Sequence, residues 1–175
     1  MLSGATVDGN AAWLGRRLGE LGAPVEGRAT VGDRDDDIGR ALRAAVTDAE
    51  FTVLTGGLGP TEDDRTRTAV AAELGERLVE DPDLVAALDA HARARERPFT
   101  PELRTLALRP VSGRALPNPA GAAPGLAFRR PGDRPGWVVL LPGVPREMRA
   151  LFPQVEALLR ETFEERLTPV FSRTI

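Results

Sequence analysis

The chain contains no cysteine and no lysine in its 175 residues. Without thiols it can form no disulfide bond, carry no cysteine nucleophile and build no thiolate metal site. Without lysine it cannot form a P-loop, whose lysine contacts the bound phosphates. The arginines are scattered along a chain of net charge −3, and no apolar run approaches a membrane span. We therefore expect neither a nucleic acid nor a membrane as partner.

The overall composition is that of an ordinary globular protein. The length and the balance of 42% hydrophobic to 28% charged residues fit one compact domain. We place this domain at residues 1–165 and interpret residues 166–175 as a tail or the beginning of a further domain. No signal peptide is recognisable, so a cytoplasmic location is expected.

Short apolar segments alternate with amphipathic ones along the chain. Strands are expected at residues 25–31, 51–54, 126–128 and 137–141. Helices are expected after Asn10, interpreted as an N-cap, and in segments that begin at Asp35, Ala69, Pro82, Pro101 and Pro145, the one from Pro82 reaching Arg97. This order predicts an α/β fold, a three-layer sandwich with a mostly parallel sheet, helices on both faces and an antiparallel hairpin edge.

The segment TGGLGPTEDDRT, from Thr55 to Thr66, connects a predicted strand to a predicted helix. Its glycines let the backbone approach a ligand closely, and the helix start offers N–H groups and a positive dipole end to phosphate oxygens. We therefore expect a site for a phosphorylated ligand. Its candidate binding residues are Thr55, Gly56, Gly57, Gly59 and Thr61.

The same helix start carries Glu62, Asp63 and Asp64, whose charges would repel a phosphate. A divalent cation (Mg, Mn or Co) between them would remove the conflict, since such ions bind carboxylates together with ligand phosphates. Asp64 and Asp63 are therefore the candidate metal ligands and catalytic residues. The alternative is that one of them only caps the helix. Arg65 and Arg67, which follow, are expected on the helix surface.

Two later segments add candidates. The small-residue run Asn118–Gly125 is either a tight connection or part of a binding site, in which Asn118 would donate and accept hydrogen bonds and Gly121 and Gly125 would give backbone access. Gly143 precedes another helix start that suits a phosphate. Glu147 follows in the first turn of that helix, where an acid is stabilising with or without a function.

Five ordered segments together resemble the N-terminal domain of the CinA family, within the MoCF-biosynthesis or molybdopterin-binding superfamily. They are VDGNAAWLGRRLGELG, VGDRDDDI, TGGLGPTEDDRT, PNPAGAAPG and LPGVPREM. They cover nearly the whole chain. The resemblance implies that Asp33, in the Val-Gly-Asp of the second segment, is also a ligand-binding residue. It further implies that Asp64 matches the aspartate shared across the superfamily.

The resemblance implies metal-dependent hydrolysis of the pyrophosphate bond of ADP-ribose or a related compound. Two alternatives stay open: a molybdopterin-binding module of molybdenum cofactor biosynthesis, and a non-catalytic oligomerisation domain. Because superfamily members form dimers or trimers, a homodimer or homotrimer is expected. The family also begins with an apolar strand and an acidic loop ahead of the position of Met1, so the first strand is expected to be lacking, and an extended N-terminus to be more stable.

Overall fold

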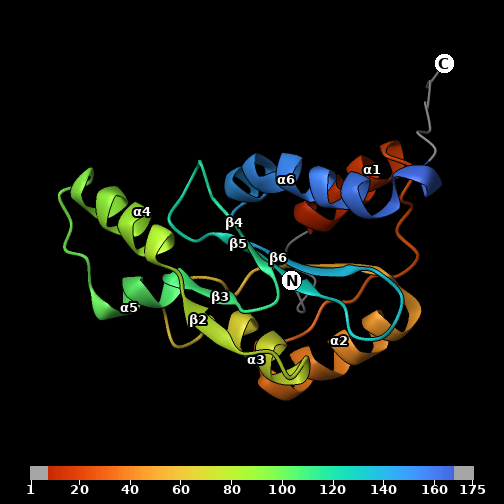
Figure 1. Ribbon diagram of the computed structural model, residues 1–175, viewed down its shortest axis with the longest axis horizontal. Helices are drawn as coiled ribbons and strands as arrows, with labels where there is room; N and C mark the ends of the chain where they lie inside the picture. Colours follow the sequence, from red (N-terminus) through yellow and green to blue (C-terminus); the bar gives the residue numbers. More distant parts are fainter. Residues whose placement is uncertain (1–7, 168–175) are drawn as a thin grey trace.

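The computed structural model describes residues 8–167 (Figure 1). The α-helices are α1 (Gly9–Glu20), α2 (Asp35–Asp48), α3 (Thr66–Glu73), α4 (Pro82–Arg93), α5 (Pro101–Arg104) and α6 (Pro145–Phe163), with short 3₁₀ segments η1 (Thr105–Ala107) and η2 (Glu164–Arg166). The strands are β1 (Phe51–Thr55), β2 (Leu78–Glu80), β3 (Leu108–Pro110), β4 (Arg114–Leu116), β5 (Gly125–Arg129) and β6 (Trp137–Leu141).

The main sheet has four strands in the order β1-β6-β5-β4. β1 runs parallel to β6, with Val53 opposite Val139, whereas β5 is antiparallel to both of its neighbours. The α/β class and the antiparallel hairpin are thus confirmed, but the sheet is mixed instead of mostly parallel.

The strand expected at residues 25–31 does not form. Val25 and Val31 are 50% and 41% exposed, and no strand of the described residues pairs with this segment. An extended segment without a neighbour gains no ladder hydrogen bonds, so its β-branched residues alone do not make it a strand.

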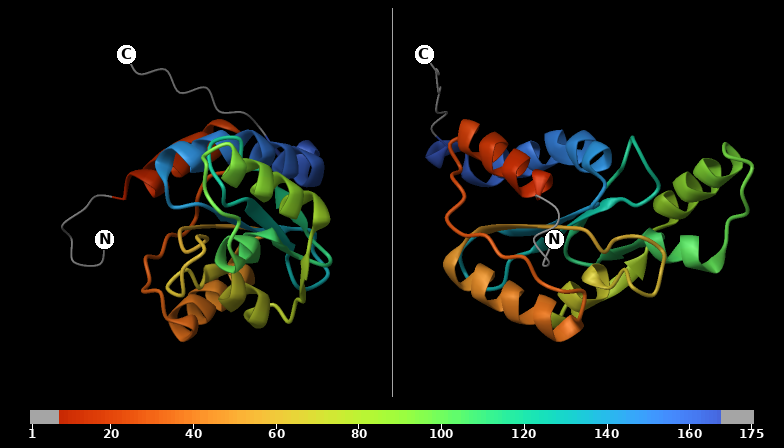
Figure 2. Two further views of the ribbon diagram at one scale, coloured as in Figure 1. Left: turned by 90° about the vertical axis from the view of Figure 1, so that its left-hand side faces the viewer. Right: turned by 180° about the vertical axis from the view of Figure 1, so that it is seen from behind.

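Helices cover both faces of the main sheet (Figures 1 and 2). Because side chains alternate along a strand, β6 contributes to two cores. Trp137 and Val139 pack with α1 and α6, whereas Val138 and Leu140 pack with α2 and α3. The three layers predicted from the sequence are therefore present.

A smaller lobe lies beside the main sheet, at the left of Figure 1. It consists of the antiparallel pair β2-β3 with α4, α5 and η1, and has its own apolar cluster of Leu84, Leu88, Leu106 and Ala107. Asp81 caps α4 by accepting a hydrogen bond from the Asp83 amide at 2.9 Å. The helix ends at Arg93 instead of Arg97.

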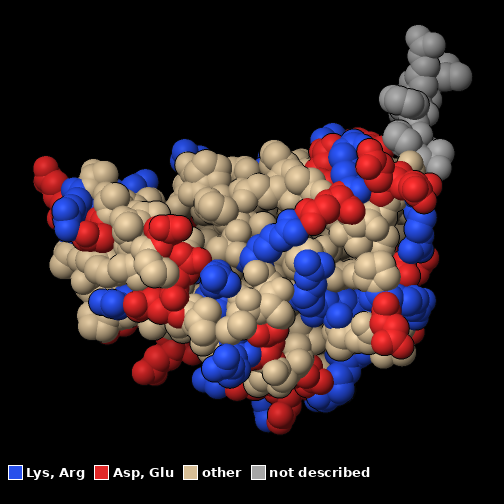
Figure 3. Space-filling view, in the orientation of Figure 1, with Lys and Arg blue, Asp and Glu red and all other residues tan. Residues whose placement is uncertain are grey.

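The surface of the described residues mixes the two signs of charge. In Figure 3, arginines and carboxylates lie beside one another over much of the visible face. Several form ion pairs across elements, such as Arg104 with Glu80 and Arg114 with Glu161. None of the helices in residues 8–167 has both the length and the apolar character needed to cross a membrane.

Candidate ligand-binding site

The glycine-rich segment forms a closed loop between β1 and α3. The Thr66 amide donates to the carbonyl oxygen of Gly57 at 3.1 Å and so joins the two ends of the loop. Inside it, the Asp64 Oδ2 accepts hydrogen bonds from the Thr61 amide at 3.1 Å and from the Thr61 hydroxyl at 2.6 Å. The buried side chain of Leu58 anchors the loop in the core under α2 and α3. The loop therefore has a defined shape without a ligand.

The glycines of this loop serve different purposes. A Cβ on Gly57 would lie 2.2 Å from the Thr66 hydroxyl oxygen, and one on Gly59 would lie 2.4 Å from Asp64 Oδ2. At these two positions a side chain would collide with Thr66 or Asp64, so the packing of the loop itself requires glycine. Gly56 differs, because it has φ of +100° and nothing lies within 4 Å of where its Cβ would be. Of the three, Gly56 is the one open to a ligand.

Three distant segments meet beside Gly56. Its amide donates to the Leu141 carbonyl at the end of β6 at 2.9 Å, and a Cβ on Gly143 would lie 3.2 Å from the Gly56 Cα. Asn10 Nδ2 donates to the Gly143 carbonyl at 2.8 Å. The meeting point is the carboxyl edge of the parallel pair β1 and β6, where ligands of open α/β sheets bind.

Asn10 has a role different from the expected one. It is 6% exposed and contacts Gly143, while Asp8 caps α1 by accepting from the Ala11 amide at 3.0 Å. Both residue types are good caps, so local sequence could not distinguish them. The interpretation of Asn10 as the N-cap was wrong because Asn10 contacts Gly143, a residue far away in the sequence.

Two helices begin at this edge of the sheet. α6 starts at Pro145, close behind Gly143, and α3 starts at Thr66, where the loop closes. Neither helix has a side-chain cap. The Thr66 amide closes the loop, Pro145 has no N–H, and the Glu147 and Met148 amides donate to the Val144 carbonyl. The positive dipole ends and the amides of Arg67 and Arg146 are therefore what the two helix starts offer to an anion.

A second cluster forms on the first turn of α6. Glu147 Oε2 accepts a hydrogen bond from Asn118 Nδ2 at 2.8 Å, and the same amide group donates to the Ala123 carbonyl at 2.8 Å. A Cβ on Gly121 would lie 2.3 Å from the Glu147 carboxylate. The structure thus brings together Asn118, Gly121 and Glu147, and the first turn of α6 joins them to Gly143.

The remaining candidates are less closely associated. Gly125 lies buried in β5, where a Cβ would be 3.0 Å from the Leu140 carbonyl, so packing between strands explains this glycine. Thr55 is the exposed last residue of β1, and Asp63 is exposed in the loop. Asp33 is exposed two residues before α2. A binding role for these four residues stays a prediction.

Asp64 is held in its ionised form. Partial burial would raise the pKa of its carboxyl group, but the Thr61 hydroxyl, the amides of Thr61 and Gly59 and the charge of Arg67 outweigh this, and the pKa lies below its ordinary value. An ionised carboxylate is what a metal or an N–H donor of a ligand requires.

The acids of the loop fit a metal that arrives with its ligand better than a resident one. Among residues 8–167, no group of three or more metal-binding side chains comes together. Asp64 Oδ2 is already engaged by Thr61, and Asp63 adds a second, exposed carboxylate. Hard divalent cations bind in this way, through one or two carboxylates completed by ligand phosphates and water.

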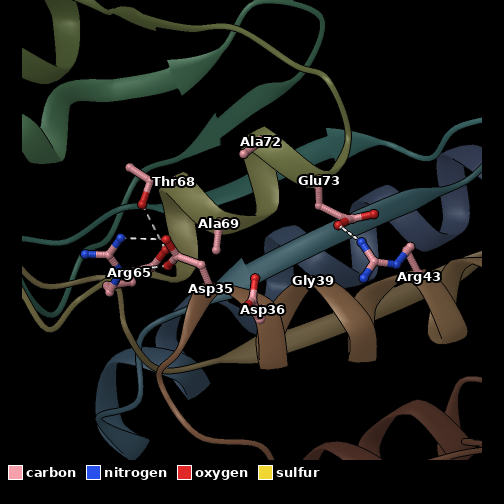
Figure 4. A pocket seen from close by; sticks show the side chains of 9 residues that line it. All are labelled: Asp35, Asp36, Gly39, Arg43, Arg65, Thr68, Ala69, Ala72 and Glu73. Carbon is pink, nitrogen blue, oxygen red and sulfur yellow. Dashed lines mark hydrogen bonds and ion pairs between the residues drawn. The ribbon is translucent and has the colours of Figure 1, made fainter.

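Two pockets of the described residues lie elsewhere, on either side of α2. One, of about 410 Å³, separates α2 from α3 (Figure 4). Arg65 and Arg43 line it, but Asp35 and Glu73 already pair with them. The other, of about 430 Å³, lies between α2 and residues 30–32. Neither is lined by a glycine of the loop, so we place the candidate site at the sheet edge on the chemistry of its residues.

Sequence reasoning missed the buried polar residues around the loop. Thr66 and Arg67 are buried in α3, although Arg67 was expected on the helix surface. Arg67 Nη2 donates to the Leu58 carbonyl at 3.1 Å. A helix this short, with small residues on most sides, has too weak a periodicity to show which face is buried.

Comparison with known proteins identifies the class. The family model described as "Probable molybdopterin binding domain" matches residues 1–161, and the chain belongs to this family. Within it, the chain resembles the N-terminal part of CinA. A CinA-like protein of Salinibacter ruber is 43% identical over 94% of this chain but 39% of its own length. The crystal structure of CinA, described as of unknown function, from Thermoplasma acidophilum has a TM-score of 0.79 at 38% identity, covering 89% of both chains.

More distant structures share the fold alone. The tungsten cofactor synthesizing protein MoaB from Pyrococcus furiosus superimposes with a TM-score of 0.59 at 18% identity, over 94% of this chain and 88% of that one.

The family model and the CinA structure together confirm the resemblance to the CinA N-terminal domain. The chain spans 39% and 41% of the length of two CinA-like relatives.

Proposed function

We propose that this domain binds a phosphorylated pterin of the molybdopterin type at the carboxyl edge of β1 and β6. The observation that carries the proposal is the open Gly56, placed beside Gly143 and between two helices without side-chain caps. Membership of the molybdopterin-binding family favours a pterin over other phosphorylated ligands.

The surrounding residues can bind both the phosphate group and the pterin ring of such a ligand. The helix starts of α3 and α6 receive the phosphate. Gly56, whose own amide donates to the Leu141 carbonyl, contributes only the space that its missing side chain leaves. Glu147, held by Asn118 on the first turn of α6, keeps Oε1 for the ligand. A carboxylate is the natural acceptor for the neighbouring N–H groups of a pterin ring, because it can accept two of them at once.

The test is a binding titration of the 175-residue chain with molybdopterin under anaerobic conditions. Glu147→Gln should weaken binding by about tenfold or more, because the loss of a charged hydrogen bond is worth roughly 1.5–3 kcal/mol. Glu161→Gln, a change of the same type at the exposed far end of α6, should leave the affinity unchanged. If the chain shows no affinity for molybdopterin, or if both variants bind as the parent does, the proposed site is wrong.

A second candidate function is metal-dependent hydrolysis of ADP-ribose. It is favoured by the adjacent Asp63 and Asp64, of which Asp64 is ionised. These two residues would hold a divalent cation, which would neutralise the diphosphate when bound. Asp64→Asn should lower AMP release by orders of magnitude while keeping the loop, because the Asn carbonyl can still accept from Thr61. If the parent chain releases no AMP with Mg²⁺, Mn²⁺ or Co²⁺, this candidate is excluded.

A further inference from the structure

Arg67 is the most deeply buried charged side chain in the described part of the protein. It is 4% exposed and lies in α3, immediately after the glycine-rich loop. Burying a guanidinium is costly unless its N–H groups find acceptors. Burial lowers the pKa of Arg67 to about 10, although the Asp64 carboxylate opposes the shift, so the group is still charged at neutral pH.

The acceptors of Arg67 are backbone carbonyls. Nη2 donates to the Leu58 carbonyl at 3.1 Å and Nη1 donates to the Thr105 carbonyl at 3.2 Å. Nε is buried without a hydrogen-bond partner, and no salt bridge within residues 8–167 includes Arg67. The burial of Arg67 is therefore offset by the hydrogen bonds to the two carbonyls and not by a salt bridge, so the effect of this side chain falls on the two segments that supply them.

The two carbonyls belong to different parts of the molecule. Leu58 lies in the glycine-rich loop, and its side chain packs in the core of the main sheet. Thr105 begins η1, whose residues Leu106 and Ala107 pack in the cluster of the smaller lobe. The planar fork of one guanidinium thus spans from the candidate site to the smaller lobe, and its rigid geometry fixes the two carbonyls relative to each other.

We propose that Arg67 is a positioning residue for the candidate site: it fixes the Leu58 carbonyl, and with it the glycine-rich loop, against the smaller lobe. This inference rests on the proposed function for its effect on binding, but its effect on the loop is independent of any ligand. With the Leu58 carbonyl turned inward to Arg67, the open side of the loop at Gly56 stays available to phosphate.

The test compares Arg67→Lys and Arg67→Met with the parent chain by amide hydrogen exchange and by molybdopterin titration. Lys keeps the charge but has no fork, and Met keeps the apolar stem alone. Exchange in residues 55–64 should rise by about tenfold or more in both variants, because each loses a charged hydrogen bond to the loop. Exchange in α6 should change much less. Molybdopterin affinity should fall by about tenfold or more in both, at a temperature at which both are fully folded.

Arg65→Met is the matched control, since Arg65 is exposed and pairs with Asp35 outside the loop. It should alter neither loop exchange nor affinity. Equal acceleration of exchange in the loop and in α6 would mean a general loss of stability and would overturn the proposal, as would unchanged loop exchange in Arg67→Lys. If Arg67→Met does not fold, the loop exchange of Arg67→Lys alone decides whether the proposal holds. A parent chain that binds no molybdopterin would refute the proposed function but leave the exchange comparison valid.

Discussion

Two carboxylates of the site are each packed against a glycine, but they are held in different ways. Asp64 lies against Gly59 and accepts from Thr61, so its side-chain hydrogen bonds lie within one short loop. Glu147 lies against Gly121 and accepts from Asn118, which is 29 residues away in the sequence. A carboxylate packed against a glycine is thus held by local contacts at Asp64 and by long-range contacts at Glu147.

The difference determines what each carboxylate depends on. Asp64 is held by Thr61, three residues away, in a loop that the Thr66 amide closes and that Arg67 fixes at the Leu58 carbonyl. Glu147 depends on the β4–β5 connection docking on α6, because Asn118 also holds the Ala123 carbonyl and its Oδ1 accepts from the Ala120 amide at 2.9 Å. The substitution of one neighbouring side chain should therefore alter more contacts around Glu147 than around Asp64.

The largest effect should come from Asn118→Ala. The change removes three hydrogen bonds, to Glu147, Ala123 and the Ala120 amide. We expect the free energy of unfolding to fall by about 2–3 kcal/mol, since partly buried acceptors lose their donors. Urea unfolding measures it. Gln154→Ala, which removes a single exposed hydrogen bond to the Pro117 carbonyl beside the same loop, should cost about 1 kcal/mol or less. Equal losses in the two variants would contradict the long-range role of Asn118.

An intermediate effect is expected from Gly59→Ala and Gly121→Ala. Each methyl group would displace a carboxylate that now lies within 2.5 Å of the Cβ position. Because a carboxylate is the mobile end of its side chain, the stability loss should be about 1 kcal/mol. In Gly121→Ala the affinity for molybdopterin should fall by about tenfold, since the displaced Glu147 carboxylate also leaves the ligand.

Gly19→Ala is the control for the glycine variants. It lies in α1 with nothing within 4 Å of its Cβ position. Alanine in the last turn of a helix should stabilise the protein by roughly 0.5 kcal/mol and leave the affinity for molybdopterin unchanged. If Gly121→Ala had the same affinity for molybdopterin as Gly19→Ala, Glu147 would not belong to the site.

The smallest effect is expected from Thr61→Val, and it should depend on pH. The pKa of Asp64 is lowered in the folded protein, so its ionised form adds stability above the ordinary carboxyl pKa, and this stability is lost as the pH falls through the lowered value. Removing the Thr61 hydroxyl brings the pKa of Asp64 back toward its ordinary value. The stability difference from the parent, about 0.5–1 kcal/mol near neutral pH, should shrink below about pH 4.

Urea unfolding between neutral and acidic pH measures this difference. Thr47→Val removes a hydroxyl that donates to the Arg43 carbonyl at 2.8 Å and involves no carboxylate. Its effect on stability should not vary with pH. A difference for Thr61→Val that also stays constant with pH would show that the hydroxyl does not influence the ionisation of Asp64.

The sequence predicted best where a signal is local. The turn residues, the helix starts at Pro82 and Pro145, and the hairpin before β6 follow from neighbouring residues, and the structure contains them. The contact between Asn10 and Gly143 and the burial of Arg67 join segments that no spacing rule connects. The glycines were recognised as significant, but which of them faces a ligand depends on Thr66 and Asp64, whose orientations only the folded loop defines.

The hydrogen bond from Asn10 to Gly143 joins residues 133 positions apart, which sets an order of events on the ribosome. At roughly 5–20 residues per second, Asn10 is synthesised about 7–27 seconds before Gly143, whose carbonyl it contacts. In that interval the apolar stripe of Leu14 and Leu18 has no α6 to cover it. The apolar face of α1 is thus exposed for longer during synthesis than that of α6, and its packing is completed only when the last of the described α-helices has been made.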